Sequence, residues 1–239
     1  MIRFVGLALA LGLQAGPALA QELTLDFGDQ GSLGLRSVQL LALITLLSLV
    51  PGLAIMITCF PFIVTVLSIL RQAIGLQQAP PNMLIVSLAL FLTWFVMDPV
   101  FTAAWTEGIE PLTRNETDLR TAFNATLAPF RSFMAARLDP DTFASLQALR
   151  PGAQGVAADA ELSLLVPSFL LSEVQRAFEI GFLIFLPFLI IDLVVAAVLM
   201  SMGMMMVPPA IVALPFKLAF FVVADGWALV SGALVRSYL

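Results

Sequence analysis

The sequence predicts an all-α membrane protein built from broken helical hairpins, with a small helical insertion between them. Of its 239 residues, 60% are hydrophobic and 11% are charged, whereas a soluble domain averages about 25% charged residues. Several apolar runs reach the ~20 residues that one helical crossing of a bilayer needs. Prolines interrupt these runs, and a proline inside a helix removes one backbone donor and clashes with the preceding turn. Together these observations favour membrane helices that are broken into pieces.

Residues 1–20 are predicted to be a secretory signal peptide. Arg3 supplies a positive start, the run from Phe4 to Leu13 is apolar, and Ala18-Leu19-Ala20 has the small-x-small pattern of a cleavage site. The alternative is an uncleaved first membrane helix, but the polar residues that follow favour cleavage. Residues 21–37 would then form a short periplasmic lead-in.

Residues 38–106 are expected to form the first membrane hairpin. Pro51 and Pro61 interrupt its first apolar run, which extends from Val38 to Leu70. This run is either one kinked crossing or a broken helical hairpin, and periodicity cannot decide because the run is apolar all round.

A second apolar run follows from Met83 to Trp105. Its helix is expected to end or kink near Asp98-Pro99, because the residue before a proline avoids the helical region.

Residues 107–167 differ in composition and predict a helical periplasmic insertion. The stretch from Glu107 to Glu161 contains 13 of the 27 charged residues of the chain. Asp141 is a candidate N-cap for a short helix that would place Phe143 and Leu146 on one face.

Residues 168–239 are expected to form a second membrane hairpin with a methionine-rich tip. Five of the ten methionines lie within the stretch Met200–Pro209, in which Gly203 and Pro208-Pro209 disfavour a continuous helix. The turn would present Met204, Met205 and Met206. Unbranched, polarisable thioethers can pack together and still yield, which suits a constriction that closes and opens. The alternative is an apolar turn that faces lipid or protein core.

Two charges interrupt the apolar sequence of this second hairpin. An unpaired charge at the centre of a membrane helix costs ~2.5–3.5 kcal/mol on insertion scales. Asp192 and Lys217 are nearly equidistant from the methionine tip, so a symmetric hairpin places them at the same depth. They are predicted to pair, within one subunit or between neighbours, and Asp225 could share the lysine. The alternative is that these charges extend to water at an interface.

Glu173, Arg176 and Glu179 are spaced three residues apart, so they are neighbours along a helix. Two interpretations remain open: a solvated face near the lipid headgroups, or a contact between subunits.

Composition also argues against several functional classes. The chain has no histidine and a single cysteine, so it can form neither an intramolecular disulfide nor a Cys/His zinc site. The usual imidazole acid-base group is missing, and no pair of carboxylates stands out. The pI of about 4.6 disfavours nucleic acid, because a basic surface is needed to neutralise phosphates. We therefore predict no enzyme activity, no metal site, no cofactor and no nucleic-acid partner.

Several stretches resemble the FliP/SctR family of type III secretion export-apparatus proteins. The resemblance extends over roughly Ser48–Val100 and from Ser168 to the end of the sequence. The matching stretches are Leu70–Ala73, Gln77–Asn82, Leu90–Thr93, Gly181–Phe185, Ile190–Ala196, Val198–Pro209, Leu214–Leu218 and Asp225–Trp227.

The resemblance implies a function. Members of that family form a pentamer with FliQ-like and FliR-like membrane subunits, in a helical, conical complex at the base of a flagellum or injectisome. Unfolded substrates pass along its axis, and methionine loops form a gasket in the pore. Carried over, the gasket falls on Met204, Met205 and Met206, and the buried charges used in assembly are Asp192, Lys217 and Asp225.

With its predicted signal peptide, the sequence resembles the flagellar branch of this family more than the injectisome branch. The resemblance therefore implies an inner-membrane location in the flagellar basal body. A small-solute transporter is a competing hypothesis, because transporters also use broken helices and midplane charges. A third hypothesis is a structural scaffold whose methionines only pack.

Overall fold

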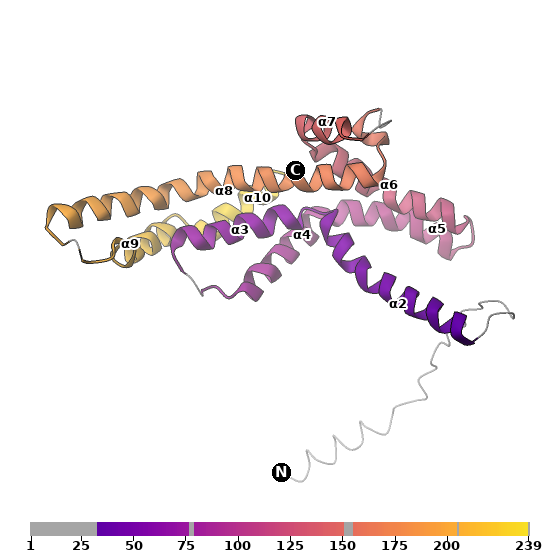
Figure 1. Cartoon of the computed structure of the whole chain (residues 1–239), viewed down its shortest axis with the longest axis horizontal. Helices are drawn as coiled ribbons and strands as arrows, with labels where there is room; N and C mark the ends of the chain where they lie inside the picture. The colour runs from indigo at the N-terminus through magenta and orange to yellow at the C-terminus, as the bar shows by residue number, and fades with distance from the viewer. Residues whose placement is uncertain (1–32, 77–78, 151–154, 205, 239) are drawn as a thin grey trace, which may run out of the picture. The chain divides into compact units, whose positions relative to one another are not determined.

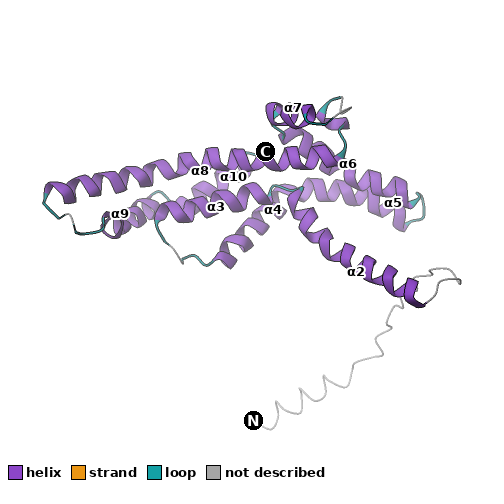
Figure 2. Cartoon of the chain, in the orientation of Figure 1, coloured by secondary structure: helices purple, strands orange, loops and turns teal. Residues whose placement is uncertain are grey.

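The computed structural model describes residues 33–76, 79–150, 155–204 and 206–238, which contain helices and no strand (Figures 1 and 2). The predicted signal peptide and most of the predicted lead-in lie outside the described residues. The elements are α2 (Leu33–Met56), α3 (Phe60–Ile74), α4 (Asn82–Ala104), the π-helical turn η2 (Trp105–Ile109), α5 (Glu110–Thr113), α6 (Leu119–Arg137), α7 (Pro140–Ala148), the 3-10 turn η3 (Ala157–Asp159), α8 (Leu162–Ser201), α9 (Pro209–Val223) and α10 (Gly226–Arg236).

The chain divides into two compact units, residues 1–48 and 49–239. In the second unit, α3 supplies much of the core: it has buried side chains from Phe62 to Ile74 and packs against α4, α8 and α9. Its buried side chains include Phe62, Leu67 and Leu70. This short apolar helix is therefore covered by protein on several sides.

The first apolar run is interrupted and consists of two helices, α2 and α3. α2 tolerates Pro51 in its interior, but the helix stops at Met56 and α3 begins at Phe60 with Pro61 in its first turn. The hydroxyl of Thr58 donates to the carbonyl of Ile55 at 2.7 Å, so a carbonyl freed at the end of α2 has a partner.

Of the two outcomes predicted at Asp98-Pro99, an end or a kink, the helix end is wrong. α4 runs through Pro99 and continues through η2 into α5. Neighbouring helices can compensate for the backbone bond that a proline removes in a membrane helix, and α4 packs against both α3 and α6. The preference of a single dipeptide is overridden by this packing.

Three helical stretches are long and apolar enough to cross a membrane: Ser37–Met56, Asn82–Thr113 and Leu162–Ser201. The pair α9 and α10, bent by 60° at their junction, is a candidate fourth span. α8 has 40 residues and is thus ~60 Å long at 1.5 Å per residue, about twice the ~30 Å hydrocarbon thickness. Its first part is therefore free to pack against the insertion.

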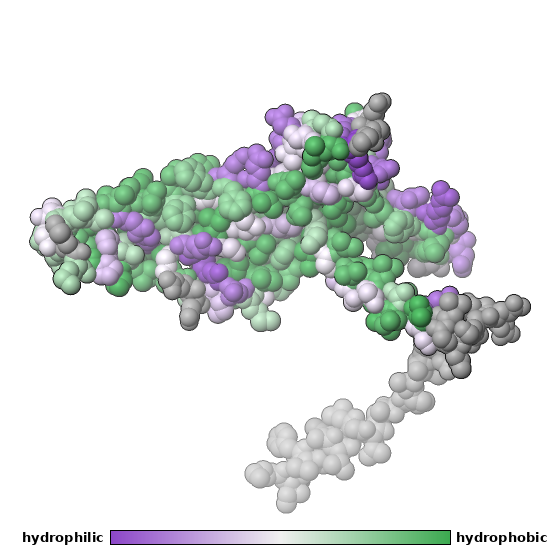
Figure 3. All heavy atoms as spheres, viewed as in Figure 1, coloured by the Kyte–Doolittle hydropathy of each residue, from purple (hydrophilic) through white to green (hydrophobic). Residues whose placement is uncertain are grey.

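The insertion is helical, as predicted, and docks on the first part of α8. Met134 of α6 forms a small buried cluster with Leu165 and Phe169 of α8. The backbone N–H of Asp139 donates to Ser172 of α8 at 3.0 Å. In Figure 3, hydrophilic residues gather over the insertion and hydrophobic residues cover much of the hairpin formed by α8 and α9.

The N-cap of α7 is Asp139, so the prediction of Asp141 is wrong. The Asp139 carboxylate accepts from the backbone N–H and the hydroxyl of Thr142, both at 2.8 Å. The start of the helix is shifted because Pro140 occupies its first position, where a missing N–H costs nothing.

Acid is expected to loosen α7. The two hydrogen bonds from Thr142 hold the pKa of Asp139 below its ordinary value of 3.8. A carboxyl whose pKa is lowered by folding stabilises the fold above its unfolded pKa, and this contribution is lost as the pH falls through the folded pKa. Hydrogen exchange of the α7 amides should accelerate below pH 3.8 in the native chain. Replacing Asp139 with Asn should weaken this pH dependence, and replacing Asp141 with Asn should preserve it.

Candidate functional site

The methionine-rich stretch is the turn between α8 and α9, as predicted. α8 ends in a Schellman motif: Met204 N–H donates to Leu199 O at 3.0 Å and Gly203 N–H to Met200 O at 3.1 Å. Gly203 has a φ of 74°, which favours a residue without a Cβ atom. Pro208 and Pro209 then begin α9. Gly203 thus suits the end of α8, and Pro208 and Pro209 suit the start of α9.

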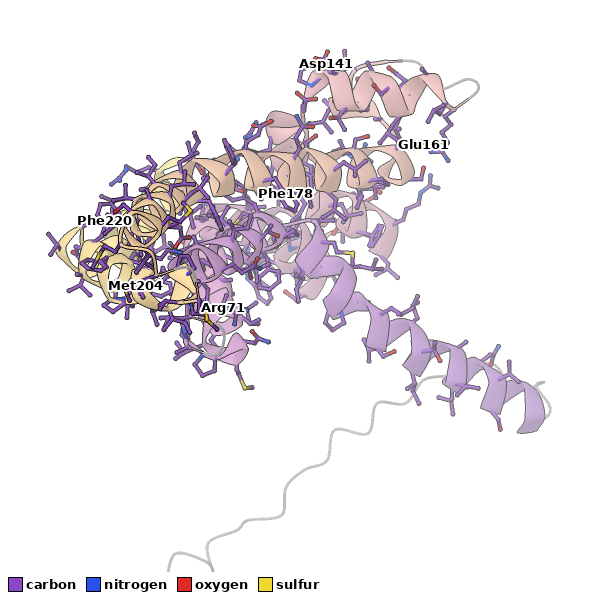
Figure 4. The ribbon with its side chains drawn as sticks, turned by 60° about the vertical axis from the view of Figure 1, so that its left-hand side comes forward. Arg71, Asp141, Glu161, Phe178, Met204 and Phe220 are labelled. Carbon is purple, nitrogen blue, oxygen red and sulfur yellow. The ribbon has the colours of Figure 1, made fainter. Side chains whose placement is uncertain are left out.

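The methionine side chains of this turn are exposed in the chain. Met202 is 66% exposed, Met204 41% and Met206 97%, while Met205 lies outside the described residues. Figure 4 shows Met204 at the end of the second unit opposite Asp141 and Glu161 of the insertion. These thioethers are therefore free to contact other molecules.

An apolar groove of about 550 Å³ lies between α8 and α9 beside the turn. Met202 and Met204 line it together with aliphatic side chains and Phe216. It offers no polar group to fix the orientation of a solute, although ligand sites usually contain a few such groups.

Asp192 and Lys217 pair within one chain, across the hairpin. The Lys217 ammonium donates to Asp192 Oδ2 at 2.6 Å, and only 8% of the lysine side chain is exposed. Asp192 is 31% exposed, and its other oxygen is buried without a partner among the described residues. The prediction from spacing is confirmed for one of its two forms, pairing within a subunit.

Lys217 also reaches α3. Its ammonium donates to the carbonyl of Ala73 at 3.2 Å, in the last turn of α3, where carbonyls lack helical partners. A cation at a helix C-terminus is also favoured by the helix dipole. Lys217 thus connects the hairpin of α8 and α9 to α3.

Asp225 does not share this lysine, so that part of the prediction is wrong. It is exposed, adopts a φ of 48° and forms the junction between α9 and α10. The 60° bend at this junction breaks the straight helical spacing on which the prediction relied.

Glu173 is not part of a solvated face with Arg176 and Glu179. It is 0% exposed and binds residues from two other segments. Arg137 at the end of α6 donates from Nε to its carboxylate at 3.3 Å, and the Tyr238 hydroxyl donates to its second oxygen. Glu179 is exposed and accepts from Gln175 at 3.1 Å. The three-residue spacing placed these groups on adjacent turns but could not show which one faces inward.

Arg137 and Tyr238 were missed by sequence reasoning. Arg137 also donates to Ser237 O at 2.7 Å, and its guanidinium lies 4.0 Å from the centre of the Tyr238 ring. Burial raises the pKa of Tyr238 above its usual range, so its hydroxyl remains a donor. Tyr238 is the single tyrosine of the chain; no motif connects it to Glu173, and the one signal is that the two residues are nearly equidistant from the methionine turn.

The described residues contain no group of three or more His, Cys, Asp or Glu side chains suited to a metal ion. What the site offers is packing by thioethers and aliphatic groups, stabilised by buried ion pairs.

Known proteins resemble this chain along most of its length. A sequence model of the FliP family matches residues 43–234. "Flagellar biosynthetic protein FliP" of Caulobacter vibrioides is 50% identical over 97% of this chain and 88% of its own length. The proteins of that name from Rhizobium meliloti and Bacillus subtilis are 45% and 43% identical, over 100% and 84% of this chain and 100% and 92% of their own lengths. The chain belongs to the FliP family.

Proposed function

We propose that this chain is a pore-forming core subunit of the flagellar type III protein export gate in the bacterial inner membrane. Copies of it form a pentamer with FliQ-like and FliR-like subunits and let unfolded proteins pass along the axis. Membership of the FliP family and relatives whose names specify flagellar biosynthesis support this role. An injectisome gate is the nearest alternative.

The exposed methionine turn is the observation that carries the proposal. Met202, Met204 and Met206 are 66%, 41% and 97% exposed, and the backbone at the two ends of the turn is held by the Schellman motif and by Pro208 and Pro209. Several such turns around an axis pack sulfur against sulfur and close a hole. Thioethers tolerate repacking, so the closed ring can yield to a passing chain.

The other predicted site residues divide into internal and external groups. Asp192, Lys217 and Glu173 are bound within the chain. Asp225 and Glu179 are exposed and Arg176 is partly exposed, so these three are the candidates for contacts between subunits. A small-solute transporter is less well supported, because the groove beside the turn is lined by apolar side chains.

Replacing Met204, Met205 and Met206 with alanine should make the assembled complex leak. Alanine removes the flexible side chains that fill the axis but preserves the backbone of the turn. The measurement is ion or dye release from vesicles that contain the complex, together with the mass of the complex. We expect a severalfold faster release at unchanged mass.

A matched control replaces Met56 and Met83, which are 45% and 81% exposed elsewhere in the chain, with alanine. This variant should release ions or dye no faster than the native complex. Loss of assembly without leakage would favour a scaffold, and a tight, intact triple variant would contradict the gasket.

A further inference from the structure

We infer that Tyr238 is a positioning residue that, with Glu173 and Arg137, keeps the two arms of the methionine hairpin in register. Its consequence at the methionine turn rests on the proposed function, but the register itself is a property of the chain. Tyr238 lies two residues beyond α10, at the opposite end of the hairpin from the turn.

The bond between Tyr238 and Glu173 forms a second crosslink across the hairpin. The first, between Asp192 and Lys217, joins residues 25 positions apart, and the second joins residues 65 positions apart. Both pairs are centred on the methionine stretch, within one residue of each other. If the two arms lie antiparallel and are not shifted along their axes, the residues of both pairs come into contact.

Apolar packing alone leaves this register weakly specified. Apolar contact is not directional, and Asp192 and Lys217 are the only charged residues of α9 and of the part of α8 from Phe182 to Met200. The returning arm is also bent by 60° between α9 and α10, so the bond at Lys217 cannot fix what lies beyond the bend. Buried polar pairs are best attested as devices that specify register.

The cluster holds Tyr238 from several directions. Arg137 binds the preceding carbonyl of Ser237 at 2.7 Å and covers one ring face at 4.0 Å. Phe133 stacks at 6.1 Å and Phe62 meets the ring edge-on at 5.5 Å, between ring centres. The hydroxyl bonded to Glu173 therefore has a fixed position, and the cluster also connects α3, α6 and α8.

The test measures the register directly with spin labels on the full chain. Cysteines replace Val198 of α8 and Leu229 of α10, which are 51% and 60% exposed, so that one label lies beyond the bend. Opposite arms place these positions ~25 Å apart along the hairpin at 1.5 Å per residue. Labelled chain is diluted into excess unlabelled chain before assembly with the FliQ-like and FliR-like subunits. The buried Cys59 stays in place, and chain without added cysteines must take up no label.

The native chain should give a single distance between the two spin labels. Tyr238→Phe retains the ring contacts and removes the hydroxyl; we expect a second population displaced by about one helical turn, ~5.4 Å, and faster dye release by the assembled complex. Tyr238→Ala should enlarge that population. The control Phe143→Leu trims a buried side chain of α7 and should retain one distance even where it lowers the melting temperature equally.

A single native distance in Tyr238→Phe would overturn the inference, as would the same second population in Phe143→Leu. The proposed function is tested separately. If the alanine variant of the methionines leaks and Tyr238→Phe retains one distance, the gasket stands and the register inference fails. If Tyr238→Phe shifts the register and the alanine variant of the methionines does not leak, the register inference stands and the gasket fails.

Discussion

Replacing Lys217 with methionine should lower the free energy of unfolding of the chain by about 2–3 kcal/mol. Removing one partner of a buried ion pair costs ~3–5 kcal/mol, because the remaining charge is left without compensation. Lys217 is 8% exposed but Asp192 is 31% exposed, so water reduces the penalty and we expect less than the full range. The carbonyl of Ala73 also loses its donor. Unfolding in detergent, followed by heat or denaturant, measures the change.

The double variant Lys217→Met with Asp192→Asn should be more stable than the sum of its two single variants predicts. It contains no uncompensated charge, and contacting residues show interaction energies of ~0.5–3 kcal/mol. The surface control is Arg120→Met, because Arg120 is exposed on α6; its effect should stay within about 0.5 kcal/mol. Strictly additive losses at 192 and 217 would show that the two charges do not stabilise each other.

The parts of the hairpin that could be predicted are those with local or symmetric causes. Gly203 and the two prolines are backbone signals that act within a few residues, and they placed the turn correctly. The pairing of Asp192 with Lys217 followed from the cost of burying a charge and from equal distances to that turn. In each case the physical requirement is contained in the residues themselves.

The cluster around Glu173 could not be predicted, because its partners are remote. Arg137 is 36 residues away, and nothing in that spacing indicates contact. Tyr238 is 65 residues away, at a position nearly symmetric to Glu173 about the turn, but this symmetry predicts a pair only where a buried charge requires one. Composition required that a buried Glu173 have a partner but gave no sign that Glu173 was buried. Its helix is apolar on nearly every side, so periodicity does not identify the inward face.

Predictions from short sequence patterns also failed where tertiary packing favoured a different structure. Pro99 predicts a helix end or a kink through the conformation of the residue before it, but α4 does not end there and packs against α3 and α6. Asp141 and Asp139 are equally suited to cap a helix, and the choice depends on where Pro140 can be accommodated. These errors change where individual helices begin and end and leave the fold class unchanged.

Replacing Gly108 with alanine should destabilise the chain by about 2–3 kcal/mol, the upper part of the range for an overpacked site. Gly108 is the buried residue of the π-helical turn η2, where α6 crosses it. A Cβ atom there would overlap the hydroxyl of Thr126 and lie 2.6 Å from its backbone nitrogen and 2.7 Å from its Cα atom. Backbone cannot move aside as a side chain can, so α6 must shift. Thermal unfolding and hydrogen exchange of α6 should both report the change.

A second glycine supplies the matched comparison for this prediction. At Gly181 of α8, a new Cβ atom would overlap Cδ1 of Ile69, with the next two atoms of that side chain at 3.1 and 3.3 Å. Ile69→Val removes the overlapping methyl group and should restore much of the stability lost in Gly181→Ala. Thr126→Ala removes the hydroxyl but not the backbone atoms, so it should not rescue Gly108→Ala. If Thr126→Ala did rescue it, the helix crossing would be limited by a side chain, and the insertion could move against α4 more freely than this backbone contact allows.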